Sequence, residues 1–170
     1  MAKFISQNGI KIANQKNTFH MTTLNSIETF LSNEKVAVAG VSRKKQKFGN
    51  AIYNELDKKG FRVFPVNPNM DDYLGGKCYH SISDLPDDVQ AIVINTKHDT
   101  TLRLIQEAKE KGIKHVWLQQ GSLDKKAGVV PEEPGMNIIA SECILMHAGD
   151  VRGVHAFHRW LKKSFGHFPS

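Results

Sequence analysis

The sequence has few cysteines and no long apolar run, and each absence excludes a class of protein. Two cysteines in 170 residues, Cys78 and Cys143, are too few for the disulfide framework of a small secreted domain. No apolar run reaches the ~20 residues that a membrane-spanning helix needs, and residues 1–20 contain no apolar segment typical of a signal peptide. The sequence therefore predicts a cytoplasmic protein with reduced thiols and no membrane partner.

Acidic residues are absent from both ends of the chain, where the excess positive charge is concentrated. Of the 23 Lys and Arg residues, seven lie in residues 1–20 and 151–170, which leaves 16 against all 17 Asp and Glu between them. We interpret 1–20 as a mobile arm, 21–150 as the folded domain and 151–170 as a basic amphipathic helix. Solvated ends explain this charge more simply than nucleic-acid binding does. The helix is expected to pack on the domain, on a protein partner or on a second copy.

Strand-like and helix-like patterns alternate from residue 35 onward. Apolar runs predict strands at 35–39, 61–66, 91–95, 115–119 and 137–140, and helical spacing predicts helices at 49–59, 100–111 and 152–165, with another that begins after Thr22 or Thr23. Between them we expect a loop at 69–77, a short strand at 78–80, one helical turn at 83–86 and a short helix at 124–129. This alternation predicts an α/β fold, a Rossmann-like doubly wound parallel sheet of about five strands in a single domain.

A cluster of cations follows the first predicted strand, which runs into Gly40 and Ser42. Four cations then come within five residues, before a helix begins: Arg43, Lys44, Lys45 and Lys47. In doubly wound sheets a ligand binds at the carboxyl ends of the strands, where a helix N-terminus offers N–H groups to phosphate. Other strand ends supply small or polar residues to the same rim: Asn67-Pro68, Asn95-Thr96 and Gly121. This arrangement predicts a small nucleotide ligand with several phosphates.

Two common phosphate-binding motifs are incomplete in this loop. An NAD site requires G-x-G-x-x-G and an acid at the end of the second strand. Here Ser42 replaces the second glycine, the next glycine is Gly49, and residues 65–68 contain no acid. The P-loop pattern G-x-x-x-x-G-K-[ST] is also absent. The cations would suit the 2′-phosphate of NADP, so an NADP-dependent oxidoreductase stays open as an alternative.

Several short motifs occur in an order and spacing that resemble a known family. They are Val38-Ala39-Gly40-Val41-Ser42, Gly49, Val63-Phe64-Pro65-Val66-Asn67-Pro68, Leu74-Gly75-Gly76-Lys77-Cys78-Tyr79, Ser83-Asp84-Leu85-Pro86 and Trp117-Leu118-Gln119-Gln120-Gly121. Over roughly residues 22–146 the chain resembles the small stand-alone CoA-binding proteins. Their domain is similar to the N-terminal CoA-binding domain of the succinyl-CoA synthetase α subunit.

The resemblance implies that coenzyme A or an acyl-CoA binds at the strand-end rim. The residues that it implicates are Gly40, Val41, Ser42, Arg43, Lys44, Gly49, Val66, Asn67, Pro68, Asn95, Thr96 and Gly121. By this resemblance, backbone N–H groups at Gly40 and Ser42 would reach the pyrophosphate, and residues 43–44 would meet phosphate charge. Residues 67–68 would border the nucleotide, and Gly121 would allow close approach of the thiol arm.

No motif for catalysis is present. The G-x-S-x-G elbow of serine hydrolases and the H-E-x-x-H of zinc hydrolases are absent. The larger ligases need a phosphorylatable histidine in a second domain and an ATP-grasp partner, for which this chain has no room. Residues 95–96 also depart from the Pro-rich turn that those ligases carry near the pantetheine. We therefore predict binding without catalysis and assign no catalytic or metal-ligating residue, whether the protein acts alone or supplies CoA to another enzyme.

A Cys/His set near the C-terminus supports the remaining alternative. Cys143 and His147 are four residues apart, and His155 and His158 are three apart on the predicted terminal helix. Such spacing is compatible with metal ligands or with a thiol activated by a histidine. A metal or redox protein built on residues 143–158 therefore stays open, beside the simpler interpretation of a buried cysteine and surface histidines.

Overall fold

The computed structural model describes residues 22–123 and 133–148. The predicted arm at 1–20, the short helix at 124–129 and the terminal helix at 152–165 lie outside the described residues. No helix within the described ranges is both long and apolar enough to cross a membrane.

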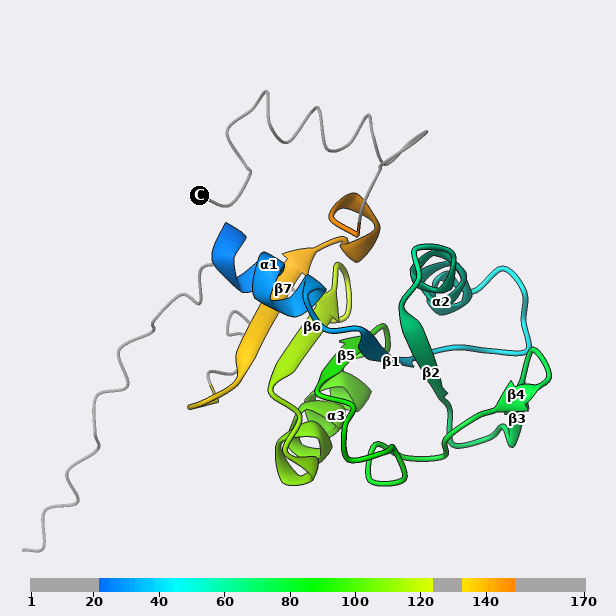
Figure 1. Cartoon of the computed structure of the whole chain (residues 1–170). Coiled ribbons are helices and arrows are strands. Elements are labelled where there is room, and N and C mark those ends of the chain that lie inside the picture. Colours follow the sequence, from blue (N-terminus) through cyan, green and yellow to red (C-terminus); the bar gives the residue numbers. More distant parts are fainter. Residues whose placement is uncertain (1–21, 124–132, 149–170) are drawn as a thin grey trace, which may run out of the picture.

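Five parallel strands form the central sheet, as predicted (Figure 1). They are β1 (Lys35–Ala39), β2 (Arg62–Val66), β5 (Ala91–Ile94), β6 (His115–Gln119) and β7 (Asn137–Glu142). Their order is β2-β1-β5-β6-β7, which is the flavodoxin-like arrangement of doubly wound sheets. The chain winds outward in opposite directions from β1 and β5, so the topological switch point lies between these two strands. The fold class predicted from the sequence is confirmed.

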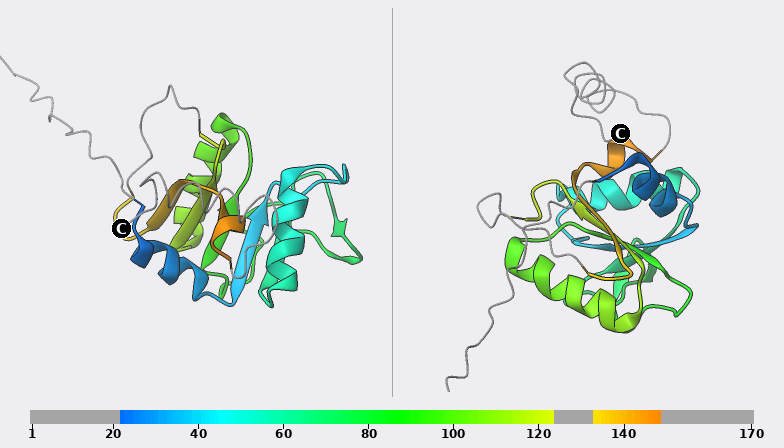
Figure 2. Two further views of the ribbon diagram at one scale, coloured as in Figure 1. Left: turned by 90° about the horizontal axis from the view of Figure 1, so that it is seen from above. Right: turned by 90° about the vertical axis from the view of Figure 1, so that its left-hand side faces the viewer.

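Helices cover both faces of the sheet (Figure 2). Helices α1 (Leu24–Leu31) and α2 (Phe48–Lys58) lie on one face and α3 (His98–Lys111) lies on the other. Two apolar clusters result, because alternate strand residues point to opposite faces. Val38 and Trp117 pack with α1 and α2, whereas Ile92 packs with α3. Each long element begins and ends within two residues of its prediction, since continuous apolar runs and helical spacing are local signals.

The predicted loop at 69–77 contains an antiparallel hairpin instead, formed by β3 (Asp72–Tyr73) and β4 (Gly76–Lys77). Its two turn residues both have positive φ, 52° at Leu74 and 79° at Gly75. A two-residue turn of this kind favours Asn-Gly or Gly-Gly. Leucine in the first position therefore hid the hairpin from sequence reasoning.

Two other short elements differ in part from their predictions. The predicted strand at 78–80 forms a single bridge between Tyr79 and Val66, because the N–H of Cys78 donates to Asp71 rather than to the sheet. Pro65, on this outer edge of β2, has no N–H to offer to a longer pairing. At the predicted helical turn of 83–86, the structure has a single turn in which the N–H of Leu85 donates to the carbonyl of Ile82 (3.2 Å). Pro86 has no N–H to donate a following bond.

Candidate functional site

The carboxyl ends of β1, β2 and β5 bring most of the predicted binding residues together. The N–H of Gly40 donates to the carbonyl of Val66 (3.4 Å), and the Asn67 amide donates to the carbonyl of Val41 (2.6 Å). On the other side of β1, a β-carbon at Gly40 would lie 2.3 Å from the carbonyl oxygen of Asn95. The three strand ends therefore contact one another at the switch point. Position 40 between them has room only for glycine.

Gly49 fixes the start of α2 against the same strand end. A β-carbon on Gly49 would lie 2.1 Å from the carbonyl oxygen of Gly40. The two glycines thus allow the helix N-terminus to approach the end of β1 at backbone contact distance. This close helix–strand packing is one of the roles that glycines serve in dinucleotide-binding folds.

Within the described part of the chain, three other residues predicted at the rim do not hydrogen-bond to the loop after β1. The hydroxyl of Thr96 pairs with the hydroxyl of Thr101 in α3 (2.8 Å). Gly121 has a φ of 91°, and a β-carbon there would meet nothing within 4 Å. Among residues 22–123 and 133–148, no recorded hydrogen bond joins Thr96, Gly121 or Pro68 to the loop after β1. These three residues lie at the carboxyl ends of the strands but take no part in the contacts among Gly40, Val41, Val66, Asn67 and Asn95.

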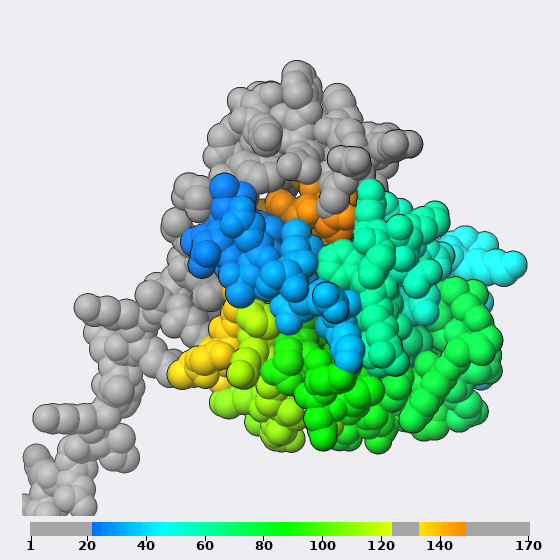
Figure 3. Space-filling model, in the orientation of Figure 1, coloured from blue at the N-terminus to red at the C-terminus, as the bar shows by residue number. Residues whose placement is uncertain are grey.

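The loop after β1 exposes four cations, which project from the body of the protein (Figure 3): Arg43, Lys44, Lys45 and Lys47. Within the part of the chain that the structure describes, no carboxylate lies within 4.0 Å of any of them. Lys47 is also the N-cap of α2, and its side chain makes no capping hydrogen bond. The N-terminus of a helix carries a partial positive charge, which adds to the charge of these cations. An anion bound at this surface would therefore be stabilised by both.

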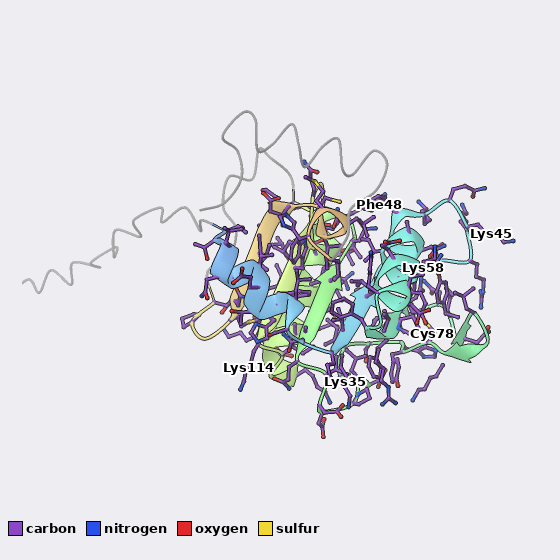
Figure 4. The ribbon with its side chains drawn as sticks, turned by 45° about the horizontal axis from the view of Figure 1, so that its top comes forward. Lys35, Lys45, Phe48, Lys58, Cys78 and Lys114 are labelled. Atoms are coloured by element: carbon purple, nitrogen blue, oxygen red, sulfur yellow. The ribbon has the colours of Figure 1, made fainter. Side chains whose placement is uncertain are left out.

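The side chains labelled in Figure 4 lie both on the loop and away from it, and they differ in the groups that they could offer a ligand. Lys45 lies on the loop (Figure 4), and Phe48, the first residue of α2, keeps 41% of its surface exposed. Lys114 lies at the far end of the molecule. Cys78 is buried, and this burial raises the pKa of its thiol, which makes it a poor nucleophile at neutral pH.

Asn50, in the first turn of α2, was not identified from the sequence. Its side chain is buried beneath the loop, where its Oδ1 accepts from the N–H of Ser42 (2.8 Å). The N–H of Gly40 is likewise occupied, so neither of the two donors expected from the resemblance is free. The N–H groups of Arg43 and Lys45 make no recorded hydrogen bond within the described residues. Sequence reasoning had little to find here, because a helical asparagine is commonly exposed to solvent, as Asn54 is.

The segment that carries Cys143 and His147 forms a short 3-10 turn, Ile144–Met146, rather than an α-helix. Cys143 is buried, and His147 Nε2 lies 3.1 Å from Glu142 Oε2 with its ring beside Trp117. No group of three or more potential metal ligands occurs in the described ranges. The histidines at 155 and 158 lie outside the described residues.

Together, these features define a doubly wound α/β domain in which a cationic loop leads from β1, beside the switch point, into a helix N-terminus, the arrangement of nucleotide-binding proteins. The family model of the CoA-binding domain matches residues 34–149, about two-thirds of the chain. The chain belongs to this family, and the resemblance found in the sequence is confirmed.

Two curated relatives are large ligases. An ADP-forming acetate–CoA ligase II of Archaeoglobus fulgidus is 41% identical over 83 residues, which are 48% of this chain and 12% of the ligase. The ADP-forming acetate–CoA ligase of Methanocaldococcus jannaschii is 33% identical over 81 residues, again 48% of this chain and 12% of the ligase. The chain therefore spans about an eighth of the length of these relatives.

A solved structure of similar size shares the fold over most of the chain. A hypothetical protein of Pyrococcus horikoshii superposes with a TM-score of 0.67 at 28% sequence identity, covering 80% of this chain and all of that protein. Small proteins with this fold thus exist beside the large ligases.

Proposed function

We propose that this protein binds coenzyme A or an acyl-CoA at the carboxyl ends of β1, β2 and β5, without catalysis of its own. The observation that carries the proposal is the cationic loop of residues 43–47, which is held against the start of α2 by Gly40 and Gly49 in a chain of the CoA-binding family. CoA has a pyrophosphate and a 3′-phosphate, and the charge of this loop fits such a ligand.

Different residues of the site would contact different parts of CoA. The N–H groups of Arg43 and Lys45 would donate to the pyrophosphate, and the neighbouring side chains would neutralise its charge. Residues 67–68 would border the nucleotide, where the missing acid avoids repulsion of the 3′-phosphate. Gly121 would lie beside the thiol arm. CoA itself would supply the thiol that carries an acyl group.

Replacing two loop cations tests the site directly. In Arg43→Ala/Lys44→Ala, we expect CoA and acetyl-CoA to bind at least tenfold more weakly than in the wild type, about 1.4 kcal/mol, because two charge-assisted contacts are lost. Isothermal titration of CoA, acetyl-CoA, NADP and NAD measures this. NAD should give no signal.

The matched control is Lys58→Ala/Lys114→Ala, which removes the same charge outside the loop, at the last residue of α2 and just before β6. It should bind CoA as the wild type does. Equal weakening in both variants would reveal only a general effect of net charge. If NADP binds more tightly than CoA, the oxidoreductase alternative replaces this proposal.

A substitution at the N-cap of α2 should move stability and affinity in opposite directions. In Lys47→Ser, a hydroxyl replaces a cation that cannot cap the helix, so the free energy of unfolding should rise by about 1 kcal/mol. Affinity for CoA should fall several-fold, because one phosphate contact is lost. Urea denaturation and titration measure the two effects. A variant that is more stable and binds CoA equally well would remove Lys47 from the proposed site.

A further inference from the structure

The polar groups beneath the cationic loop converge on a single side chain. Asn50 Oδ1 accepts a hydrogen bond from the N–H of Ser42 (2.8 Å). Its Nδ2 donates to the carbonyl of Ser42 (2.8 Å) and to the carbonyl of Lys44 (3.0 Å). The residue is only 6% exposed. One buried amide therefore uses its acceptor and both of its donors on three groups of the same loop.

These bonds determine which backbone groups the loop presents. The N–H of Ser42 and the carbonyls of Ser42 and Lys44 are turned inward to Asn50, and the N–H of Lys44 lies 3.2 Å from the Ser42 hydroxyl. The N–H groups of Arg43 and Lys45 are left without a recorded partner within the described residues. Both carbonyls are thus kept away from an anion, and two donors are kept available for one.

We propose that Asn50 is the positioning residue of the nucleotide site, holding the loop so that the N–H groups of Arg43 and Lys45 converge on a phosphate. This inference rests on the proposed function. Four cations within five residues repel one another, and this repulsion favours an open loop. The hydrogen bonds of Asn50 hold the loop closed against this repulsion before the ligand binds. Less free energy is then spent on ordering the loop during binding, which is how preorganisation raises affinity.

Only an amide satisfies all three groups. Aspartate retains an acceptor for the Ser42 N–H, but its carboxylate cannot donate to the two carbonyls and faces their oxygens instead. Alanine removes the partner of the Ser42 N–H and of the Ser42 carbonyl, and it leaves the Lys44 carbonyl with the N–H of Lys47 (3.1 Å). Asn54 provides a matched control, because it is the same residue type one turn later on α2 and is exposed.

The experiment compares Asn50→Ala, Asn50→Asp and Asn54→Ala with the wild type by two measurements on the full chain. Isothermal titration gives the affinity for CoA. Limited trypsin digestion, with the cut sites identified by mass spectrometry, reports directly on loop opening, because residues 43–47 contain four trypsin sites. Cleavage at Lys58 and Lys114, outside the loop, reports on loosening of the whole fold.

We expect Asn50→Ala to bind CoA at least tenfold more weakly and to be cut several-fold faster within 43–47, with unchanged rates at Lys58 and Lys114. Asn50→Asp should also bind CoA more weakly, and it carries the test if the alanine variant does not fold. Asn54→Ala should match the wild type in both measurements.

Two results would overturn the inference while leaving the proposed function intact. One is wild-type CoA affinity in both Asn50 variants. The other is faster cleavage at all sites alike, which would make Asn50 a residue of general stability. Absence of CoA binding by the wild type would instead overturn the proposed function, and the positioning role with it.

Discussion

Replacing Gly49 with alanine is expected to destabilise the protein by about 1–3 kcal/mol and to abolish measurable CoA binding. Two effects of opposite sign compete. Alanine is favoured over glycine within a helix by about 1 kcal/mol, which alone would stabilise α2. The new β-carbon, however, would lie 2.1 Å from the carbonyl oxygen of Gly40 and 3.1 Å from the N–H nitrogen of Val41. Backbone atoms cannot rotate away, so the helix must move from the strand, and overpacking of this kind outweighs the gain in propensity.

Urea denaturation of Gly49→Ala and of Gly76→Ala measures the difference. Gly76 has no positive φ, and a β-carbon there would meet its nearest atom at an ordinary 3.6 Å. Gly76→Ala should therefore keep a stability close to that of the wild type and should bind CoA normally. A neutral or stabilising effect of Gly49→Ala would mean that α2 does not approach β1 at backbone contact distance in solution.

Much of the fold follows from local patterns in the chain. The runs that form β1 and β5 are apolar at nearly every position because both faces of these strands are covered, and such runs are recognisable without a structure. Glycine signals were equally local where they end a helix, as Gly112 does with a φ of 82°. The hairpin at 72–77 was missed because Leu74 takes a conformation that leucine rarely adopts.

The candidate site was predictable in its position and not in its hydrogen bonding. A strand that ends in glycine before a cationic loop indicates where a phosphate would bind. Which N–H groups stay free depends on partners in another element, and composition does not reveal them. Ser42 is an example, because its N–H is occupied by a side chain eight residues later. The contact between Asn67 and Val41 joins residues 26 apart in sequence and is equally invisible to periodicity.

Replacing Trp117 with alanine is expected to destabilise the protein by about 3–5 kcal/mol, the range for truncating a buried aromatic residue. Trp117 is fully buried in β6, and its ring makes a T-shaped contact with the ring of Phe30, with centroids 5.3 Å apart. Its indole N–H also donates to the carbonyl of Glu142 (3.0 Å). The β6–β7 pairing is irregular between Trp117 and Gln119, so this side-chain bond holds β7 where the regular ladder is interrupted.

Trp117→Phe separates the two contributions. Phenylalanine keeps most of the apolar volume beside Phe30 but cannot donate to the carbonyl of Glu142, which also accepts from the N–H of Gln120 (3.2 Å). We expect a loss of about 1–2 kcal/mol for this variant, measured by urea denaturation followed by far-ultraviolet circular dichroism. The larger loss in the alanine variant is a substantial fraction of a typical domain stability of roughly 5–15 kcal/mol. If the two variants were equally destabilised, packing against Phe30 would contribute little, and the indole hydrogen bond would account for the effect of Trp117 on the end of β7.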